Sequence, residues 1–313
     1  MCLVLAETAA GAGGGPRLDP NRLAQLPAEG LAAEVGSSLV IVSASGRALG
    51  HLDGYSLGEE PALDQLAPGP RPLAVRDRSG ASLVLDRTGG KLVLATPGRL
   101  RLAGRTLLVR RGGRWMLHGS RVAFVSERRD LVTLFGRRSF RVLDLLSGRS
   151  ASVPFGCRAA ARREARWFLL CGYPLGGPRA ASTVQVRAPG GSVRILFGPA
   201  EGAALPAGWW TSAFLSRDGS RLLLQWSGQC EIPVAFFART SGGKVTTVTG
   251  QPGLRGAPES VALGWSRDGR AVVDLPKGAC GGSASRPGVY LIDPASGKRA
   301  YVYRHSRFWR ALS

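Results

Sequence analysis

The sequence predicts an all-β fold, a six-bladed antiparallel β-propeller built as a single domain. The main observation is a pattern that occurs six times: an apolar strand, a polar turn with glycine, and a second strand. The glycines that mark these turns are Gly46, Gly90, Gly148, Gly191, Gly243 and Gly297. They follow one another at intervals of 43 to 58 residues. Repeats of about 40 to 50 residues made of short strands are typical of propellers, with one four-stranded blade per repeat.

The repeats extend over residues 39–302, which sets the expected domain organisation. We expect an N-terminal leader over residues 1–30 and the propeller over residues 31–313. The leader begins MCLVLAETAAGAGGGP, where a short apolar run stops at Glu7 and no basic residue precedes it. It is therefore either the tail of a secretion signal that starts upstream, the reading we favour, or a flexible Ala/Gly segment. A lipid anchor on Cys2 would need a Leu-rich segment before it.

The charge balance is strongly basic, with 42 Lys and Arg against 21 Asp and Glu, a formal net charge of +21. Such a surface attracts anionic partners. Arginine is spread over every repeat, and the sequence has neither a basic tail nor an aromatic and basic stripe, so nucleic acid is not the expected partner. No stretch reaches the ~18 apolar residues of a membrane-spanning helix.

Four of the five cysteines are expected to form two disulfides. Cys157 and Cys171 lie at equal distances from a hairpin centred near residue 164, so they should face each other across two strands. Cys230 and Cys280 occupy equivalent positions in consecutive repeats, 50 residues apart, and their loops should meet. Disulfides indicate an extracytoplasmic location, secreted or associated with the cell envelope. Buried free thiols are the alternative, and with them a cytoplasmic location stays open.

The clearest blade covers residues 209–250 and shows how the acidic residues are used. Asp218 and Gly219 stand between two apolar segments as a hairpin signal, and Asp268 and Gly269 repeat the arrangement. Asp293 opens the last turn, which closes at Gly297. We interpret all six as structural turn residues. The final residues, HSRFWRALS, resemble a first strand and are expected to pair with the first blade and close the ring.

These turns carry a resemblance to a known family. The segment SRDGSRLLLQW, followed by a loop, a strand and a Gly-Lys hairpin, resembles the WD40-like PD40 repeat of TolB-like propellers. The similarity covers residues 209–303 and is weak before residue 155. Arg217 and Arg267 stand where the family usually has Pro. The resemblance implies a six-bladed propeller, commonly extracytoplasmic, that serves as a platform for protein interaction.

The sequence offers no catalytic motif, metal site or cofactor site, because it lacks a nucleophile elbow, a phosphate-binding loop and a CxxC pair. We therefore expect a monomeric, non-catalytic scaffold, not an enzyme, that binds a protein, a peptide or an anionic envelope polymer. The alternative is a propeller hydrolase or lyase that acts on a carbohydrate or peptide in the central channel. The expected binding surface is the basic loop with Lys277 and Arg286.

Overall fold

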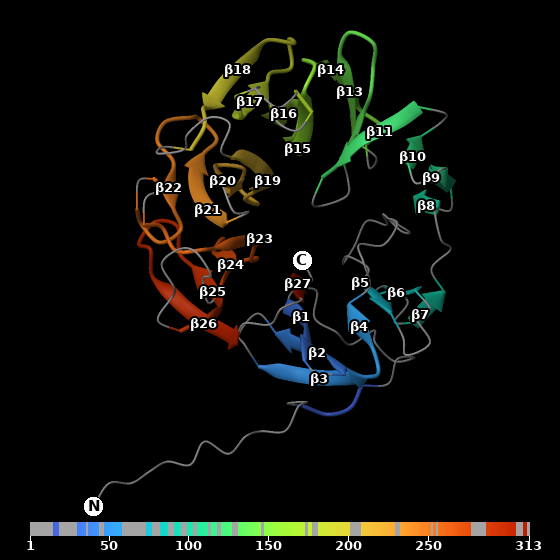
Figure 1. Ribbon diagram of the computed structural model, residues 1–313, viewed down its shortest axis with the longest axis vertical. Coiled ribbons are helices and arrows are strands. Elements are labelled where there is room, and N and C mark those ends of the chain that lie inside the picture. Colours follow the sequence, from blue (N-terminus) through green and yellow to red (C-terminus); the bar gives the residue numbers. More distant parts are fainter. Residues whose placement is uncertain are drawn as a thin grey trace, which may run out of the picture. The chain divides into compact units, whose positions relative to one another are not determined.

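The computed structural model describes most of the chain between residues 15 and 311. The described residues are 15–18, 30–35, 37–43, 47–57, 73–76, 82–86, 91–94, 99–102, 105–111, 114–117, 120–126, 131–144, 147–172, 175–176, 181–200, 208–228, 232–251, 253–254, 256–276, 286–304 and 309–311. All regular structure in these ranges is β-strand (Figure 1). Within them there is accordingly no helix that could cross a membrane.

The chain forms two compact units, and the first contains β1 to β7 together with β27. Its strands make two antiparallel sheets, in the orders β27-β1-β2-β3 and β4-β5-β6-β7. The bounds are β1 Gly30–Val35, β2 Ser38–Ser43, β3 Ala48–Asp53, β4 Ser56–Leu57, β5 Leu73–Arg76, β6 Ser82–Asp86, β7 Lys91–Leu94 and β27 Trp309–Ala311. The C-terminal β27 pairs with β1, the first strand, so the predicted pairing of the C-terminus is confirmed.

Part of the N-terminal leader is hydrogen-bonded to the first unit. Residues 15–18 lie beside β3, where Leu18 N donates to His51 O at 2.8 Å and His51 N donates to Pro16 O at 3.0 Å. Arg17 also approaches Asp53, with 3.6 Å between Nε and Oδ2. These four residues thus belong to the edge of the sheet.

The second unit contains β8 to β26 in four antiparallel sheets. One has seven strands in the order β14-β13-β12-β11-β10-β9-β8, and three have four strands each, β15 to β18, β19 to β22 and β23 to β26. The bounds in the seven-stranded sheet are β8 Arg99–Leu102, β9 Arg105–Arg111, β10 Arg114–Leu117, β11 Ser120–Val125, β12 Leu131–Leu134, β13 Phe140–Asp144 and β14 Ser150–Val153. Those of the other three sheets are β15 Cys157–Arg163, β16 Arg166–Cys171, β17 Thr183–Arg187, β18 Val193–Phe197, β19 Trp209–Leu215, β20 Arg221–Ser227, β21 Pro233–Arg239, β22 Thr246–Thr247, β23 Val261–Trp265, β24 Ala271–Leu275, β25 Gly288–Ile292 and β26 Arg299–Arg304.

The six repeats of the sequence are six antiparallel pairs, one in each sheet that the structure describes. The pairs are β2 with β3, β6 with β7, β13 with β14, β17 with β18, β21 with β22, and β25 with β26. Strands β8, β9 and β10 fall in the longest interval between repeats, to which the pattern assigned no strand, and they extend the sheet of β11 to β14. The all-β prediction is confirmed, and successive sheets of sequential strands are consistent with a β-propeller.

A shared irregularity shows that the sheets of the second unit are variants of one design. The first strand of the β11–β14, β15–β18, β19–β22 and β23–β26 sets carries a register shift where it pairs with the second strand. An apolar core lies between the β15–β18 and β19–β22 sheets, and Phe168 and Val184 belong to it from the first of them. The second sheet contributes Trp210, Trp226 and Phe236: the rings of Trp210 and Trp226 are 4.9 Å apart, and Trp210 also contacts Phe236. All three side chains are buried. The sheets are therefore held to one another by apolar packing.

Candidate functional site

The turn that contains Asp218 and Gly219 is closed by side chains of its own sequence. The Ser216 hydroxyl donates to Asp218 Oδ1 at 2.6 Å and accepts the Arg221 amide at 3.0 Å, while Ser220 N donates to Asp218 Oδ1 at 3.1 Å. Gly219 has a φ of 71°, which favours glycine. Hydrogen bonds from Ser216 and then Ser220 lower the pKa of Asp218 from 3.8 to about 2, and the charge of Arg163 adds to them. The Asp218 carboxylate therefore serves to stabilise its own turn through hydrogen bonds.

Asp268 and Asp293 are held in similar ways. Ser266 donates to Asp268 through its hydroxyl, and the hydrogen bond from Arg270 is the main cause of the lowered pKa of Asp268. Asp293 Oδ1 accepts the amides of Ala295 and Ser296, both at 2.8 Å, and the Ser296 amide is the main cause of its lowered pKa. These carboxylates are committed to local turns.

The same serine-closed turn occurs earlier in the chain than the sequence resemblance extends. Ser126 Oγ accepts the Leu131 amide at 3.1 Å, and Ser126 N donates to Leu131 O at 2.9 Å. Ser216 and Ser266 make the equivalent pairs with Arg221 and Arg270. The serine that ends the first strand, rather than the Asp-Gly pair, is therefore the feature shared by the three sheets.

The predicted pairing of Cys157 with Cys171 is confirmed by a disulfide with a Cα separation of 4.0 Å. The two cysteines are directly opposite in the β15–β16 register. The turn of this hairpin lies between Arg163 and Arg166, half a residue beyond the expected centre, and a bulge at Ala160 restores the alignment. The predicted pairing is therefore correct, but the register that produces it contains a β-bulge that the sequence did not predict.

The other predicted residues are only partly described. Cys230, Cys280 and Lys277 lie outside the described residues. Arg286 is described: its guanidinium lies 3.7 Å from the centre of the Tyr301 ring, and its carbonyl accepts the Tyr290 hydroxyl. Arg286 is thus held against its own sheet by a cation–π contact.

Several arginines join neighbouring sheets, a role that the sequence did not indicate. Arg158 is buried, with 5% of its surface exposed, and its Nη2 donates to the carbonyls of Trp210 at 2.9 Å and Thr211 at 3.1 Å. Arg194 reaches the carbonyl of Ser241, and Arg299 reaches that of Thr249. Part of the large excess of arginine is therefore structural. The planar guanidinium is well suited to joining sheets, because its several N–H groups can donate hydrogen bonds to more than one carbonyl.

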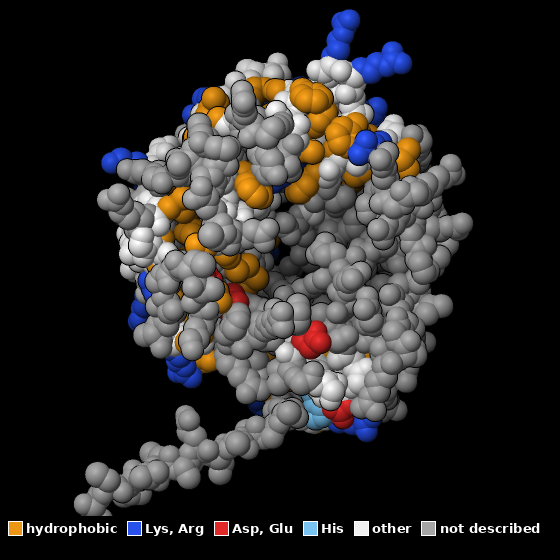
Figure 2. Space-filling model, in the orientation of Figure 1, with side chains coloured by type: hydrophobic (Ala, Val, Ile, Leu, Met, Phe, Trp, Pro, Cys, Tyr) orange, Lys and Arg blue, Asp and Glu red, His pale blue; other side chains and the backbone are white. Residues whose placement is uncertain are grey.

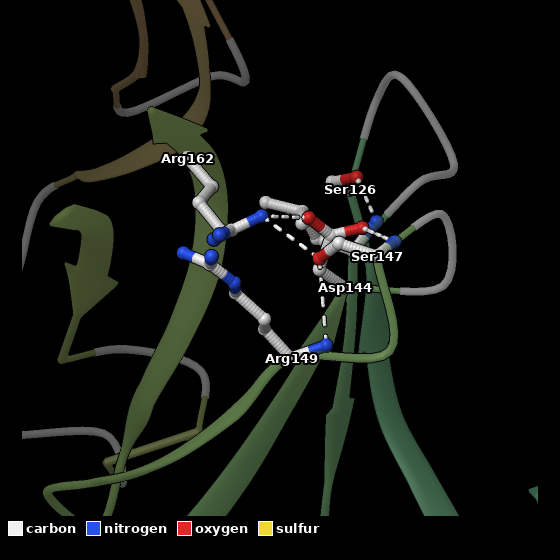
Figure 3. A network of polar contacts seen from close by, with 6 residues as sticks. Ser126, Asp144, Ser147, Arg149 and Arg162 are labelled. Carbon is white, nitrogen blue, oxygen red and sulfur yellow. Dashed lines mark hydrogen bonds and ion pairs between the residues drawn. The ribbon is translucent and has the colours of Figure 1, made fainter. Parts of the chain in front are cut away.

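Asp144 and Arg162 form the most enclosed ion pair among the described residues (Figure 3). Arg162 Nη1 donates to Asp144 Oδ2 and, at 3.0 Å, to Ser147 Oγ. The Ser147 amide donates to Asp144 Oδ1 at 3.0 Å, so the carboxylate also closes the turn after β13. The guanidinium lies 5.3 Å from the Trp167 ring centre. This network ties the β13–β14 turn to β15.

The basic pocket is a cavity of about 500 Å³ between the β19–β22 sheet and the turn that follows β25. Three cationic residues line it: Arg221, Arg239 and Lys244. Arg221 and Arg239 are directly opposite in the β20–β21 register. Like charges that face each other on adjacent strands are unfavourable, so this arrangement favours an anion that would neutralise them.

The remaining wall of the basic pocket is apolar or made of backbone, apart from the polar Thr246. Phe237 contributes a half-buried ring, and Gly242 and Gly243 contribute a turn without side chains. Pro294 and Ala295 of the next sheet complete the lining. The cavity thus combines positive charge, one aromatic surface and open backbone, which suits a small molecule or one unit of a polymer.

Two further charged groups border the basic pocket. Arg194 points at the same turn, and Nη2 lies 3.3 Å from Ser241 O. Asp293, a carboxylate next to Pro294 of the lining, is close enough to Arg221 for that charge to help lower its pKa. Among the residues that the structure describes, three lining cations outweigh this carboxylate, which already accepts turn amides, so the pocket is net positive. No group of three His, Cys, Asp or Glu that could bind a metal occurs in the described part of the chain.

No family model matches the chain, and the comparison with curated proteins found no match. Solved structures do match. Puromycin hydrolase is 16% identical with a TM-score of 0.37, and the match covers 93% of this chain and 42% of the hydrolase. A prolyl endopeptidase is 13% identical with a TM-score of 0.37, and the match covers 93% of this chain and 37% of the endopeptidase. A gluconolactonase from Xanthomonas campestris is 14% identical with a TM-score of 0.39, and the match covers 95% of this chain and 89% of the gluconolactonase. The chain thus spans less than half the length of the first two.

These comparisons correct one prediction. The expectation that the chain is not an enzyme is contradicted, because puromycin hydrolase, the prolyl endopeptidases and the gluconolactonase are all enzymes by name. The prediction rested on the absence of a known catalytic motif from the sequence. A constellation assembled from separate turns leaves no such motif.

Proposed function

We propose that the chain is a six-bladed β-propeller, with a leader over residues 1–30 and one ring over residues 31–313, and that its basic pocket binds an anionic ligand. Support for the ring is the presence of one predicted hairpin in each sheet and the pairing of β27 with β1. Ring closure by pairing of the two ends protects strand edges that would otherwise be exposed.

The observation that carries the ligand proposal is the direct opposition of Arg221 and Arg239 in the basic pocket, with Lys244 on the same wall. A ligand carboxylate or phosphate between the guanidinium groups would form charge-assisted hydrogen bonds and remove the repulsion. Phe237 would pack against the carbon skeleton beside that anion. The preferred ligand is therefore an acidic carbohydrate or another small acid with an apolar face.

An extracytoplasmic, monomeric protein is part of the same proposal. The disulfide between Cys157 and Cys171 supports an oxidising compartment. A polymer of the cell envelope with carboxylate or phosphate groups would meet the basic pocket there. The second disulfide, between Cys230 and Cys280, remains a prediction, and Lys277 with Arg286 remains a proposed second contact for a polymer.

Hydrolysis of the bound ligand is the second candidate function. The cations of the basic pocket favour it, because positive groups placed beside a carbonyl stabilise the oxyanion that forms when water or a nucleophile attacks. The substrate would be an ester, lactone, glycoside or peptide that carries an acidic group. We infer that Arg221 and Arg239 would bind this group, which leaves Lys244 to stabilise the oxyanion.

The test is calorimetric titration of the protein with a trimer of galacturonic acid and with neutral maltotriose. We expect binding of the acidic trimer alone, and weaker binding as salt rises, because screening reduces the attraction. The same mixtures, together with an acidic peptide, would be assayed for hydrolysis products. Equal binding of the two sugars would contradict the ligand proposal. Absence of products for every substrate would contradict the hydrolase alone.

A further inference from the structure

Three phenylalanines form a cluster on the β11–β14 sheet and the turn that follows it, and none of them lines the basic pocket. Phe140 is fully buried, and its ring lies 5.3 Å from that of Phe135 and 4.8 Å from that of Phe155. Phe135 is 37% exposed and Phe155 is 61% exposed. Two large apolar rings thus face solvent over a buried one. Exposed aromatic groups of this kind mark interaction surfaces when they are clustered.

The backbone that carries Phe155 is fixed on both sides, although the side chain is exposed. It belongs to a turn over residues 154–157, in which Cys157 N donates to Pro154 O at 3.2 Å and Gly156 has a φ of 79°. These features are those of a type II turn. The disulfide from Cys157 fixes the end of the turn to Cys171, and the amide of Gly172 bonds to the carbonyl of Gly156 at 3.1 Å. A backbone that is ordered before binding loses little entropy on binding.

The surroundings of the exposed rings are basic. The guanidinium of Arg121 lies 4.6 Å from the centre of the Phe135 ring, and Arg137, Arg138 and Arg141 are exposed in the same hairpin. Residues 131–143 and 150–157 contain no Asp or Glu. Figure 2 shows basic side chains that project beside hydrophobic ones in this part of the second unit. An arginine rim around an aromatic centre is typical of protein interfaces.

We propose that the phenylalanine patch, defined as Phe135, Phe155, Arg121, Arg137 and Arg138, docks an acidic peptide segment through one aromatic or aliphatic side chain. That side chain would pack between the rings of Phe135 and Phe155, and flanking carboxylates would pair with the arginines. A nucleic-acid strand fits less well, since stacking of bases needs a free ring face and Arg121 already covers one face of Phe135.

The probe is a fluorescein-labelled peptide of glutamates with a single central phenylalanine, compared with the same peptide carrying a central alanine. Fluorescence anisotropy should show tighter binding of the phenylalanine peptide, by about tenfold. Phe155→Ala should remove this difference between the peptides. Ile195→Ala is the matched control, because Ile195 is 59% exposed on β18 and lies outside the patch. It should leave both affinities unchanged.

A second variant tests the charge. Arg137→Glu with Arg138→Glu should weaken both peptides equally and reduce their salt dependence, whereas Arg239→Glu with Lys244→Glu, the same charge change in the basic pocket, should weaken them much less. The proposal is overturned if both peptides bind equally, if Phe155→Ala binds as the wild type does, or if labelled oligothymidylate binds more tightly than the phenylalanine peptide. Because Phe155 is exposed, its replacement should leave the unfolding transition in place.

Discussion

The guanidinium of Arg163, at the end of β15, lies against the backbone of Gly219 in the turn between β19 and β20. A Cβ atom at residue 219 would overlap the Nη1 and Cδ atoms of Arg163. The contact joins hairpins of neighbouring sheets and places a positive charge beside Asp218, whose pKa it helps to lower. The φ of 71° favours glycine at this position, and any larger residue would also have to displace the exposed Arg163 side chain.

Gly219→Ala should destabilise the protein more than Gly269→Ala does. Both glycines have positive φ, 71° and 81°, so alanine should cost about 1 to 2 kcal/mol at each. Nothing lies within 4 Å of the position that a Cβ would take at Gly269, so only Gly219→Ala must also displace Arg163. Urea unfolding of both variants measures the difference. Arg163→Ala should abolish it in a double-mutant cycle, and a difference that persists without Arg163 would show that the contact is not its cause.

Loss of the disulfide should destabilise the protein by about 3 kcal/mol, the chain-entropy value for a loop of this size. The loop is short, with a sequence separation of 14. Cys157→Ala with Cys171→Ala should lower the unfolding midpoint, and dithiothreitol should then have no further effect through this bond. Mass mapping without reduction would also show whether Cys230 and Cys280 are joined. An unchanged midpoint in the double variant would contradict a stabilising role for the bond.

Asp218 should stabilise the fold at neutral pH and lose this effect in acid. Its pKa is lowered from 3.8 to about 2 by the hydrogen bonds of its turn. The contribution is complete above the unfolded value near pH 4 and is lost as the pH falls toward 2. Asp218→Asn should therefore be less stable than the wild type at neutral pH, and the gap should narrow between pH 4 and pH 2. A gap that stays constant over this range would refute the assignment.

Arg158→Met should be far more damaging than Arg194→Ala. Arg158 is buried and donates to two carbonyls of β19, so its loss leaves Trp210 O and Thr211 O with fewer partners, at a cost of about 3 kcal/mol. Arg194 is exposed, and its bonds to Ser241 O are 3.3 and 3.4 Å long, so its loss should cost less than about 1 kcal/mol. Thermal unfolding compares them. Equal effects would show that burial of Arg158 is not what matters.

Local chemistry explains what the sequence could predict. Asp218 and Gly219 form a turn with their immediate neighbours, and Cys157 meets Cys171 within one hairpin, so residues close in sequence contain the information. The six hairpins could be predicted for the same reason, because each is formed by two strands that are close in the sequence. Strands β8 to β10 were missed because they lie in the interval where the repeat signal is weakest.

Contacts between sheets could not be read from one sequence. Arg158 reaches Trp210 across 52 positions, and the basic pocket joins Arg239 to Pro294. Nothing in the local pattern distinguishes these arginines from solvent-exposed ones, because their roles depend on how one sheet packs on the next. The phenylalanine patch was missed for the same reason, since Phe155 and Phe135 come from different loops.

The central claim is that the basic pocket binds an anion through Arg221, Arg239 and Lys244. The most direct test is the affinity of the galacturonate trimer for Arg239→Glu with Lys244→Glu, measured beside Arg137→Glu with Arg138→Glu. Both variants change the net charge equally, so only the position of the charge differs. We predict that the pocket variant loses about tenfold to a hundredfold in affinity while the other keeps nearly all of it. Equal losses in the two variants, or none in the pocket variant, would contradict the account.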